Sequence, residues 1–198
     1  MSEILCVTNR ALCREPFLRR VERIAEAKPA GIILREKDLP EAEYGMLADA
    51  VLRICQRYAT PCILHGFVKV AAERSCSRLH LPMDRLRSLP AEIRSGYAAL
   101  GASCHCAQDA MEAEALGCTY ITAGHIFDTA CKKGVPGRGL AFLKDICQCV
   151  SIPVYAIGGI SARNIGEVSR AGAAGACVMS GAMVCEDVRS YLSAFKEE

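Results

Sequence analysis

Short apolar runs alternate along the chain with longer segments in which apolar residues recur at helical spacing. Gly, Pro or polar residues bound each run, as is typical of strand ends and turns. The apolar runs are residues 4–7, 31–34, 62–64, 78–81, 97–103, 119–123, 153–157 and 175–179. The helical segments are residues 17–28, 41–58, a short piece ending near 74, a weak stretch ending near 95, and residues 107–116, 140–150, 163–171 and 188–195. The pattern predicts eight strands and eight helices in strict alternation.

Runs that are apolar at successive positions are typical of parallel strands covered on both faces. Alternating strands and helices predict a parallel sheet with right-handed crossovers, and eight units favour a closed (βα)8 TIM barrel. We expect residues 1–198 to form one compact barrel domain of the α/β class. The alternative is an open doubly wound sheet, although no GxGxxG motif follows the first run. The fourth unit is the weakest, because Pro90 interrupts its helix.

The composition is that of a globular protein, with 52% hydrophobic and 23% charged residues. The formal net charge is only +2, so the charge gives no reason to expect nucleic acid or an anionic membrane as a partner. No apolar stretch approaches the roughly 20 residues that a membrane-spanning helix needs. The first residues lack the basic and apolar regions of a secretory signal peptide. We therefore expect a cytoplasmic protein.

The chain has 13 cysteines, an odd number that is too sparse for a small disulfide scaffold. The segment Cys104-His105-Cys106 and the pair Cys147 and Cys149 lack the CxxC spacing of zinc sites, so we predict no metal site from them. Most of the others lie inside apolar runs and are expected to be small buried hydrophobic residues. Examples are Cys6, Cys62, Cys118 and Cys177.

The active site of a (βα)8 barrel lies at the carboxyl ends of its strands, so residues that follow each run are candidates for chemistry. Gly158-Gly159 follows the seventh run, and Ser180-Gly181 follows the eighth. Glycine lets a ligand approach the backbone, and exposed backbone N–H groups can hold an anion. Because barrels commonly bind phosphate after strands seven and eight, we predict a phosphate site at these four residues. The alternative is two turns without a ligand.

The segment after the sixth run, residues 124–139, is long, basic and rich in glycine. These features are typical of an active-site loop over an anionic substrate. His125 lies at its start, where a strand end would hold a general acid or base, and imidazole exchanges protons near neutral pH. The alternative is a structural histidine. His105, at the end of the fifth run, is the second candidate for the acid–base role.

Four blocks of the sequence are similar to one known family. The blocks are Leu34-Arg35-Glu36-Lys37, Gly124-His125-Ile126-Phe127 with Thr129 and Lys132, residues 153–160 with Asn164, and residues 171–181. On these blocks the chain resembles the thiamine phosphate synthase superfamily, which also contains the thiazole tautomerases. The similarity covers nearly the whole chain and implies the same compact barrel.

The resemblance points to one of two activities. The synthases join a hydroxymethylpyrimidine diphosphate to a thiazole phosphate, and they use Mg²⁺ held by carboxylates in an Asn-Asp-Arg and a Gln-Glu-Asp stretch. Here these places read His65-Gly66-Phe67 and Met83-Asp84-Arg85, so most of the oxygen ligands that Mg²⁺ prefers are missing. The synthases usually have proline at the position of His125, whereas the tautomerases have histidine.

The resemblance therefore implies a thiazole tautomerase-like enzyme of thiamine biosynthesis. Such an isomerase converts a carboxythiazole phosphate from a non-aromatic to an aromatic tautomer, with His125 as the residue that moves the proton. No metal or organic cofactor is implied. The implied substrate-binding residues are Arg35, Lys37, Ser103, Thr129 and Lys132, beside the phosphate-binding residues Gly158, Gly159, Ser180 and Gly181.

Three points stay open. A thiamine phosphate synthase using Mg²⁺ is one alternative, because Thr129 and Lys132 match residues that synthases use at the diphosphate. A non-catalytic barrel that binds thiazole or thiamine phosphate and regulates a partner is another. Arg35, Glu36 and Lys37 could instead be a salt-bridged strand end. The expected partner is the phosphorylated thiazole, and a homodimer and contact with thiazole-forming enzymes are also considered.

Overall fold

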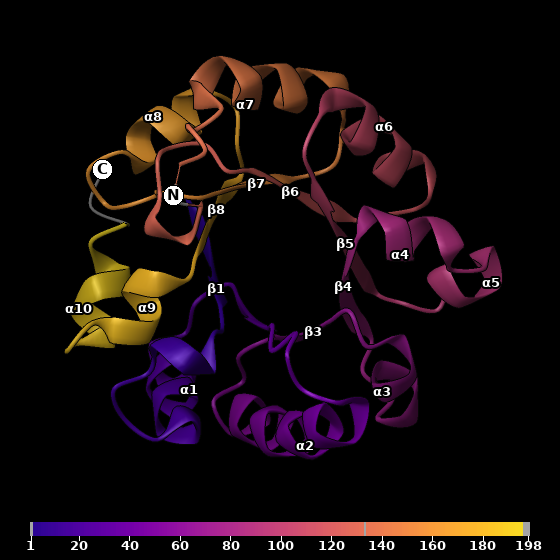
Figure 1. The fold of residues 1–198 in the computed structure, drawn as a ribbon, viewed down its shortest axis with the longest axis vertical. Helices are drawn as coiled ribbons and strands as arrows, with labels where there is room; N and C mark the ends of the chain where they lie inside the picture. The colour runs from indigo at the N-terminus through magenta and orange to yellow at the C-terminus, as the bar shows by residue number, and fades with distance from the viewer. Residues whose placement is uncertain (1, 133, 196–198) are drawn as a thin grey trace.

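The computed structural model describes residues 2–132 and 134–195. Its eight strands are all parallel and pair in chain order, and β8 pairs with β1, so the sheet closes into a barrel (Figure 1). The predicted TIM barrel is confirmed. The strands are β1 (Glu3–Val7), β2 (Gly31–Leu34), β3 (Cys62–His65), β4 (Arg78–Pro82), β5 (Ala99–Cys104), β6 (Tyr120–Gly124), β7 (Val154–Ile157) and β8 (Gly175–Val178).

The helices lie outside the ring of strands (Figure 1). Two of the segments that follow strands contain a pair of short helices: Pro90 separates α4 (Met83–Ser88) from α5 (Ala91–Arg94) after the fourth strand, and an extra helix begins at Ser180 after the eighth. The helices are α1 (Phe17–Glu26), α2 (Glu41–Arg57), α3 (Val68–Glu73), α4 (Met83–Ser88), α5 (Ala91–Arg94), α6 (Ala107–Ala115), α7 (Gly139–Cys149), α8 (Ile165–Arg170), α9 (Ser180–Val184) and α10 (Val188–Ser193).

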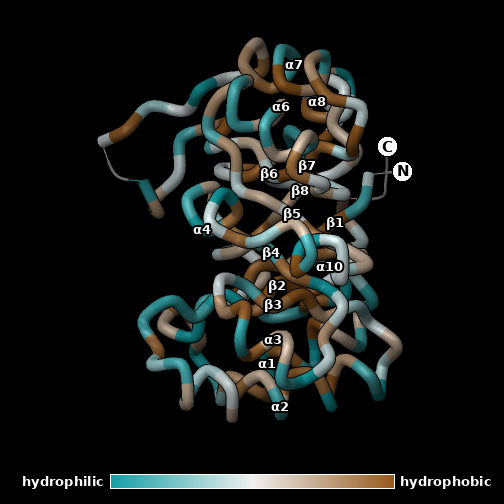
Figure 2. Tube along the Cα trace, turned by 90° about the vertical axis from the view of Figure 1, so that its right-hand side faces the viewer, coloured by the Kyte–Doolittle hydropathy of each residue, from teal (hydrophilic) through white to brown (hydrophobic). Residues whose placement is uncertain are grey.

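The strands are apolar at successive positions because both of their faces are buried. In β1, Ile4 and Cys6 belong to the large core between strands and helices, whereas Leu5 and Val7 belong to a smaller cluster within the barrel. In Figure 2 hydrophobic segments gather along the central strands, and many peripheral turns are hydrophilic. The core therefore fixes each strand in register and leaves the strand ends to carry polar side chains.

The cysteines are all free thiols. Cys6, Cys62, Cys118 and Cys177 are buried, which confirms the prediction that they are core residues. Within residues 2–132 and 134–195, no helix combines the length and the apolar character that crossing a membrane requires.

Candidate active site

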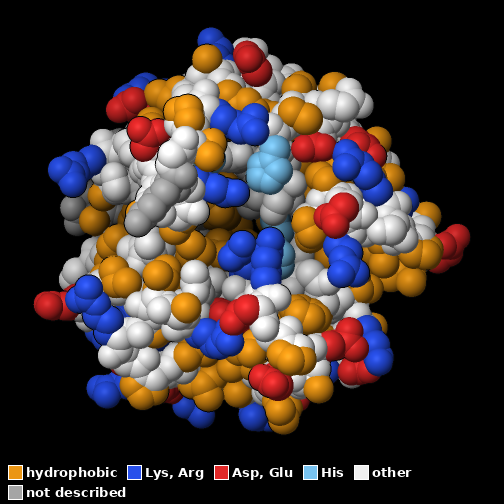
Figure 3. All heavy atoms as spheres, in the orientation of Figure 1, with side chains coloured by type: hydrophobic (Ala, Val, Ile, Leu, Met, Phe, Trp, Pro, Cys, Tyr) orange, Lys and Arg blue, Asp and Glu red, His pale blue; other side chains and the backbone are white. Residues whose placement is uncertain are grey.

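A cavity of about 330 Å³ opens at the carboxyl ends of the strands, and all eight strands contribute to its lining. All ten site residues predicted from the sequence line this cavity. Figure 3 shows Lys, Arg and His side chains around a central hollow on this face. The barrel therefore brings together residues that are as much as 146 positions apart, from Arg35 to Gly181.

Three positively charged side chains converge on the cavity. Arg35 and Lys37 follow β2, and Lys132 comes from the loop after β6, where it ends a short turn that begins at Ala130. Burial lowers the pKa of Lys37, and the positive charges of Arg35 and Lys132 lower it further. No aspartate or glutamate lines the cavity among the described residues. The site is therefore suited to an anionic ligand.

Glu36 lies between two of these charged residues but points away from the cavity. Its buried carboxylate accepts hydrogen bonds from the Thr8 hydroxyl at 2.7 Å and from the Arg10 backbone N–H at 3.1 Å. The Thr8 hydroxyl in turn accepts the backbone N–H of Arg35 at 2.9 Å. The ion pair at this strand end joins Glu36 to Arg10, at 3.3 Å, so Arg35 and Lys37 remain directed to the cavity.

His125 lies directly after β6 and lines the cavity. Its Nε2–H donates to the carbonyl oxygen of Val135 at 3.1 Å. A carbonyl can only accept, so Nε2 carries a proton in this bond, and in the neutral ring Nδ1 is the nitrogen without one. The loop closes back on its own start, because Arg138 N–H donates to the His125 carbonyl at 3.0 Å. Lys133 lies outside the described residues.

His105 also lines the cavity, beside His125. Its Nδ1–H donates to the carbonyl oxygen of Gly124 at 3.1 Å, which leaves Nε2 bare. This bond ties the end of β5 to the residue that precedes His125. The structure thus places the second acid–base candidate where it can also orient the first.

Two further histidines, which the sequence analysis gave no role, line the cavity from β3 and β4. His80 is buried, with Nδ1 3.0 Å from the Tyr120 hydroxyl and Nε2 2.9 Å from the Ser103 hydroxyl. The His65 ring stacks on it with centroids 5.6 Å apart. Burial, then Lys37 and Arg35, lowers the pKa of His65 to about 3, and burial also lowers the pKa of His80. Both rings are therefore neutral at neutral pH.

The glycines after β7 make room for the loop after β6. Gly158 and Gly159 have φ angles of +98° and +68°. A Cβ on Gly158 would lie 2.2 Å from the His125 Cβ, and one on Gly159 would lie 2.7 Å from the Asp128 carbonyl oxygen. The space beside these glycines is therefore filled by the neighbouring loop, while binding of an anion by their backbone N–H groups stays a prediction.

The residues after β8 also differ from the expected glycine turn. Ser180 is the first residue of α9, and a Cβ on Gly181 would lie 2.1 Å from the Tyr191 hydroxyl. The first hydrogen bond that the helix makes with the chain before it joins Met183 N–H to the Met179 carbonyl at 3.0 Å. The backbone N–H groups of Ser180 and Gly181 precede that bond and so have no acceptor within the helix.

The helix after Gly159 begins later than predicted. Helix α8 begins at Ile165 rather than at residue 163, and Asn164 organises the turn that precedes it. The Asn164 side chain accepts the Ser161 N–H at 2.8 Å and donates to the Gly159 carbonyl at 3.0 Å. Asn164 therefore holds the backbone of the predicted phosphate site in place.

The donor set does not fit a magnesium site. No group of three or more His, Cys, Asp or Glu side chains that could hold a metal occurs in residues 2–132 and 134–195. Asp84, which remains from the metal stretches of the synthases, lies in the first turn of α4 and does not line the cavity. Mg²⁺ prefers carboxylate and phosphate oxygens, and the described lining offers no carboxylate.

Comparison with known proteins identifies the family. The sequence model described as thiamine monophosphate synthase matches residues 4–182. The chain belongs to the thiamine monophosphate synthase family. Thiamine-phosphate synthase 2 of Streptococcus pneumoniae is 34% identical over 182 residues, covering 91% of this chain and 87% of that protein. Thiamine-phosphate synthase of Pyrococcus horikoshii is 32% identical over 190 residues, covering 94% and 89%.

A solved structure supports the same family. Thiamine phosphate pyrophosphorylase from Pyrococcus furiosus superposes with a TM-score of 0.84 at 29% identity, covering 98% of this chain and 94% of that one. The resemblance drawn from the sequence blocks is thus confirmed, and membership of the thiamine monophosphate synthase family places the chain in thiamine biosynthesis. These names do not confirm an isomerase reaction.

Proposed function

We propose that this member of the thiamine monophosphate synthase family isomerises a carboxythiazole phosphate to its aromatic tautomer. One observation carries the proposal: the described cavity lining combines four imidazoles and three cationic side chains with no carboxylate. Moving a proton between two carbons needs a base that can also return the proton, and imidazole does both. Binding a doubly anionic substrate needs cations, and this reaction needs no metal.

In this proposal each part of the reaction has its own residue. The bare Nδ1 of His125 takes the proton from one carbon and returns it to the other, while Nε2–H stays on the Val135 carbonyl. The phosphate rests on backbone N–H groups near Gly159 and Ser180, where the loops after β7 and β8 line the cavity. Arg35 and Lys37 hold the negative charge at the other end of the substrate. Aromatisation of the ring supplies the driving force.

Thiamine phosphate synthase is the second candidate. The comparisons support it better than the isomerase, because the relatives reported above carry the name of that enzyme or of thiamine phosphate pyrophosphorylase. Thr129 and Lys132 line the cavity, as a diphosphate site would require. The chemistry of the lining favours the isomerase, since a Mg²⁺-bound diphosphate would find no protein carboxylate there among the described residues. The non-catalytic regulator has no observation of its own in its favour.

Turnover of the two substrate sets separates the candidates. The purified protein is given the non-aromatic carboxythiazole phosphate in EDTA, and separately hydroxymethylpyrimidine diphosphate with thiazole phosphate and Mg²⁺. We expect isomerisation in EDTA, and no thiamine phosphate above a boiled-protein control. Formation of thiamine phosphate that EDTA abolishes, without isomerisation, would replace the proposal by the synthase. The absence of both reactions would leave the regulator.

A further inference from the structure

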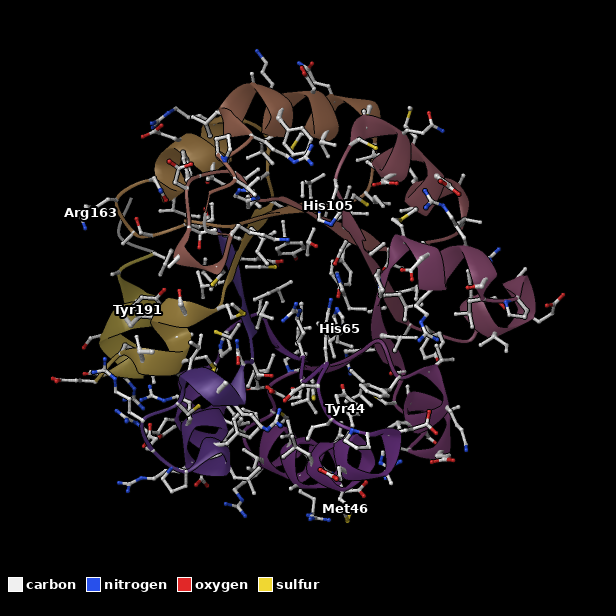
Figure 4. All side chains as sticks on the ribbon, viewed as in Figure 1. Tyr44, Met46, His65, His105, Arg163 and Tyr191 are labelled. Carbon is white, nitrogen blue, oxygen red and sulfur yellow. The ribbon has the colours of Figure 1, made fainter. Side chains whose placement is uncertain are left out.

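Among the described residues that line the cavity, His65 is the histidine whose ring makes no hydrogen bond with another residue. Its side chain lines the cavity from the end of β3, and the residue is only 5% exposed. The ring makes no hydrogen bond with any other residue that the structure describes, whereas His80 uses both of its nitrogens on Tyr120 and Ser103. Figure 4 shows His65 inside the ring of strands, on the side of β3. A buried ring with unused nitrogens is available to a ligand.

The surroundings of His65 hold its ring in one orientation. Its backbone N–H donates to the Tyr44 hydroxyl at 3.0 Å, and that hydroxyl donates to the Leu34 carbonyl at 2.7 Å. The imidazole itself stacks on the His80 ring, with centroids 5.6 Å apart. Contacts on both the backbone and the ring therefore orient the free nitrogens before any ligand arrives.

The charges near His65 indicate what the ligand group is. Lys37 and Arg35 follow the neighbouring strand β2, and together with burial they keep the imidazole neutral, with its pKa lowered to about 3. A neutral imidazole keeps one N–H donor. An anion with more than one oxygen can accept this N–H and also neutralise the two cations.

The position of His65 distinguishes this anion from the phosphate. In the closed strand order β3 lies opposite β7, and β4 lies opposite β8. A substrate whose phosphate rests after β7 and β8 therefore extends its other end toward His65. In a carboxythiazole phosphate, the second anionic group is the carboxylate.

We propose that His65 is a specificity-determining residue that donates its ring N–H to a substrate carboxylate, at the end of the cavity remote from the phosphate. The proposal rests on the proposed function for the choice of substrate. It assigns to His65 a task separate from proton transfer at His125: selecting the carboxylated thiazole phosphate over the same molecule without the carboxylate.

Dissociation constants of two stable ligands, measured by calorimetry, test this role without any turnover. The ligands are the aromatic carboxythiazole phosphate and the thiazole phosphate without the carboxylate. For the wild type we expect tighter binding of the carboxylated ligand. His65→Leu should weaken binding of that ligand about ten- to a hundredfold, as expected for a hydrogen bond to a charged group, and change the other less than threefold. His65→Asn, which keeps an N–H donor, should recover part of the preference.

Phe67→Leu is the matched control, because it disturbs the packing on Tyr44 but leaves the imidazole in place. We expect it to leave the ratio of the two affinities unchanged. Equal weakening of both ligands in His65→Leu would make the role structural and overturn the proposal. Equal affinity of the wild type for both ligands would remove the carboxylate subsite altogether.

Two further measurements keep the test decisive. Inorganic diphosphate is the competing anion: if His65→Leu lost affinity for diphosphate but not for the carboxylated ligand, the proposal would be wrong. If His65→Leu does not fold, nitrogen NMR of the histidine-labelled wild type replaces it, with a shift of the His65 ring nitrogens expected only for the carboxylated ligand. A shift with both ligands or with neither contradicts the proposal. Failure of isomerisation with the affinity ratio intact would overturn the proposed function alone.

Discussion

Substitution of Gly158 tests whether the position of His125 matters for turnover. The methyl group of Gly158→Ala would lie 2.2 Å from the His125 Cβ and 2.8 Å from its Cα, whereas ordinary contacts are 3.4–4 Å. His125 must therefore retreat by about 1 Å, a misplacement that can cost about a hundredfold in rate. We expect kcat for isomerisation to fall about a hundredfold, equivalent to about 2.7 kcal/mol in the activation free energy. KM should change little, because the phosphate and the carboxylate keep their partners.

Gly117→Ala is the matched control for backbone strain. Gly117 has a φ of +88°, close to the +98° of Gly158, but no atom lies within 4 Å of the position of its Cβ. Both variants should lose about 1 kcal/mol of unfolding free energy from placing alanine in this backbone conformation, and Gly158→Ala should lose more because its methyl group overlaps His125. Only Gly158→Ala should lose kcat in steady-state assays. Wild-type kcat in Gly158→Ala, or an equal loss in both variants, would refute the reasoning.

Three other predictions test the assigned roles. His125→Asn should lower kcat by about 10²–10⁴-fold in the same assay, and His105→Asn by much less; equal losses would move the acid–base role away from His125. The pKa of His65 is about 3 in the folded protein against an ordinary 6.5, so the unfolded chain binds a proton between these values that the native ring does not. The buried neutral ring therefore costs no stability well above pH 6.5, and its cost grows as the pH falls toward 3. The unfolding free energy of the wild type, measured in urea, should fall by about 2 kcal/mol because of this group between pH 7 and pH 5, and His65→Asn should lack that fall. Glu36→Gln should lower the unfolding free energy by about 1.5–3 kcal/mol, because it removes a buried carboxylate that accepts hydrogen bonds. Asp38→Asn removes only an exposed ion pair with Arg10 and should lower the unfolding free energy by less than about 1 kcal/mol. Equal losses in the two variants would remove the special role of the buried carboxylate.

The barrel could be predicted because its two apolar environments leave a direct pattern in the sequence. Successive strand residues are both apolar, as in Ile4 and Leu5, because Ile4 faces the helices and Leu5 faces the inside of the barrel. The segment after β8 was predicted less well. Helix α9 is only five residues long and contains Gly181, so it has too few turns for a helical period to be visible.

The residues that line the site could be predicted from the sequence, but the contacts between them could not. Strand order alone places His125 and Arg35 at the same end of the barrel. The sequence could not show that Gly158 packs against His125, because that contact depends on how the loop after β6 folds back. Nor did it give His65 and His80 a role. The available signal was a histidine at the end of β3 and another within β4, near the carboxyl end where barrels place chemistry.

The most direct test of the account is the rate at which the EDTA-treated wild-type protein aromatises the non-aromatic carboxythiazole phosphate. Proton NMR follows both tautomers during the reaction, and buffer without protein gives the uncatalysed rate. The account predicts conversion at least a hundredfold faster than in buffer, with no requirement for Mg²⁺, since proton transfer by a positioned base supplies about 10²–10⁴-fold. Conversion at the buffer rate by protein that makes thiamine phosphate when Mg²⁺ is added would contradict it.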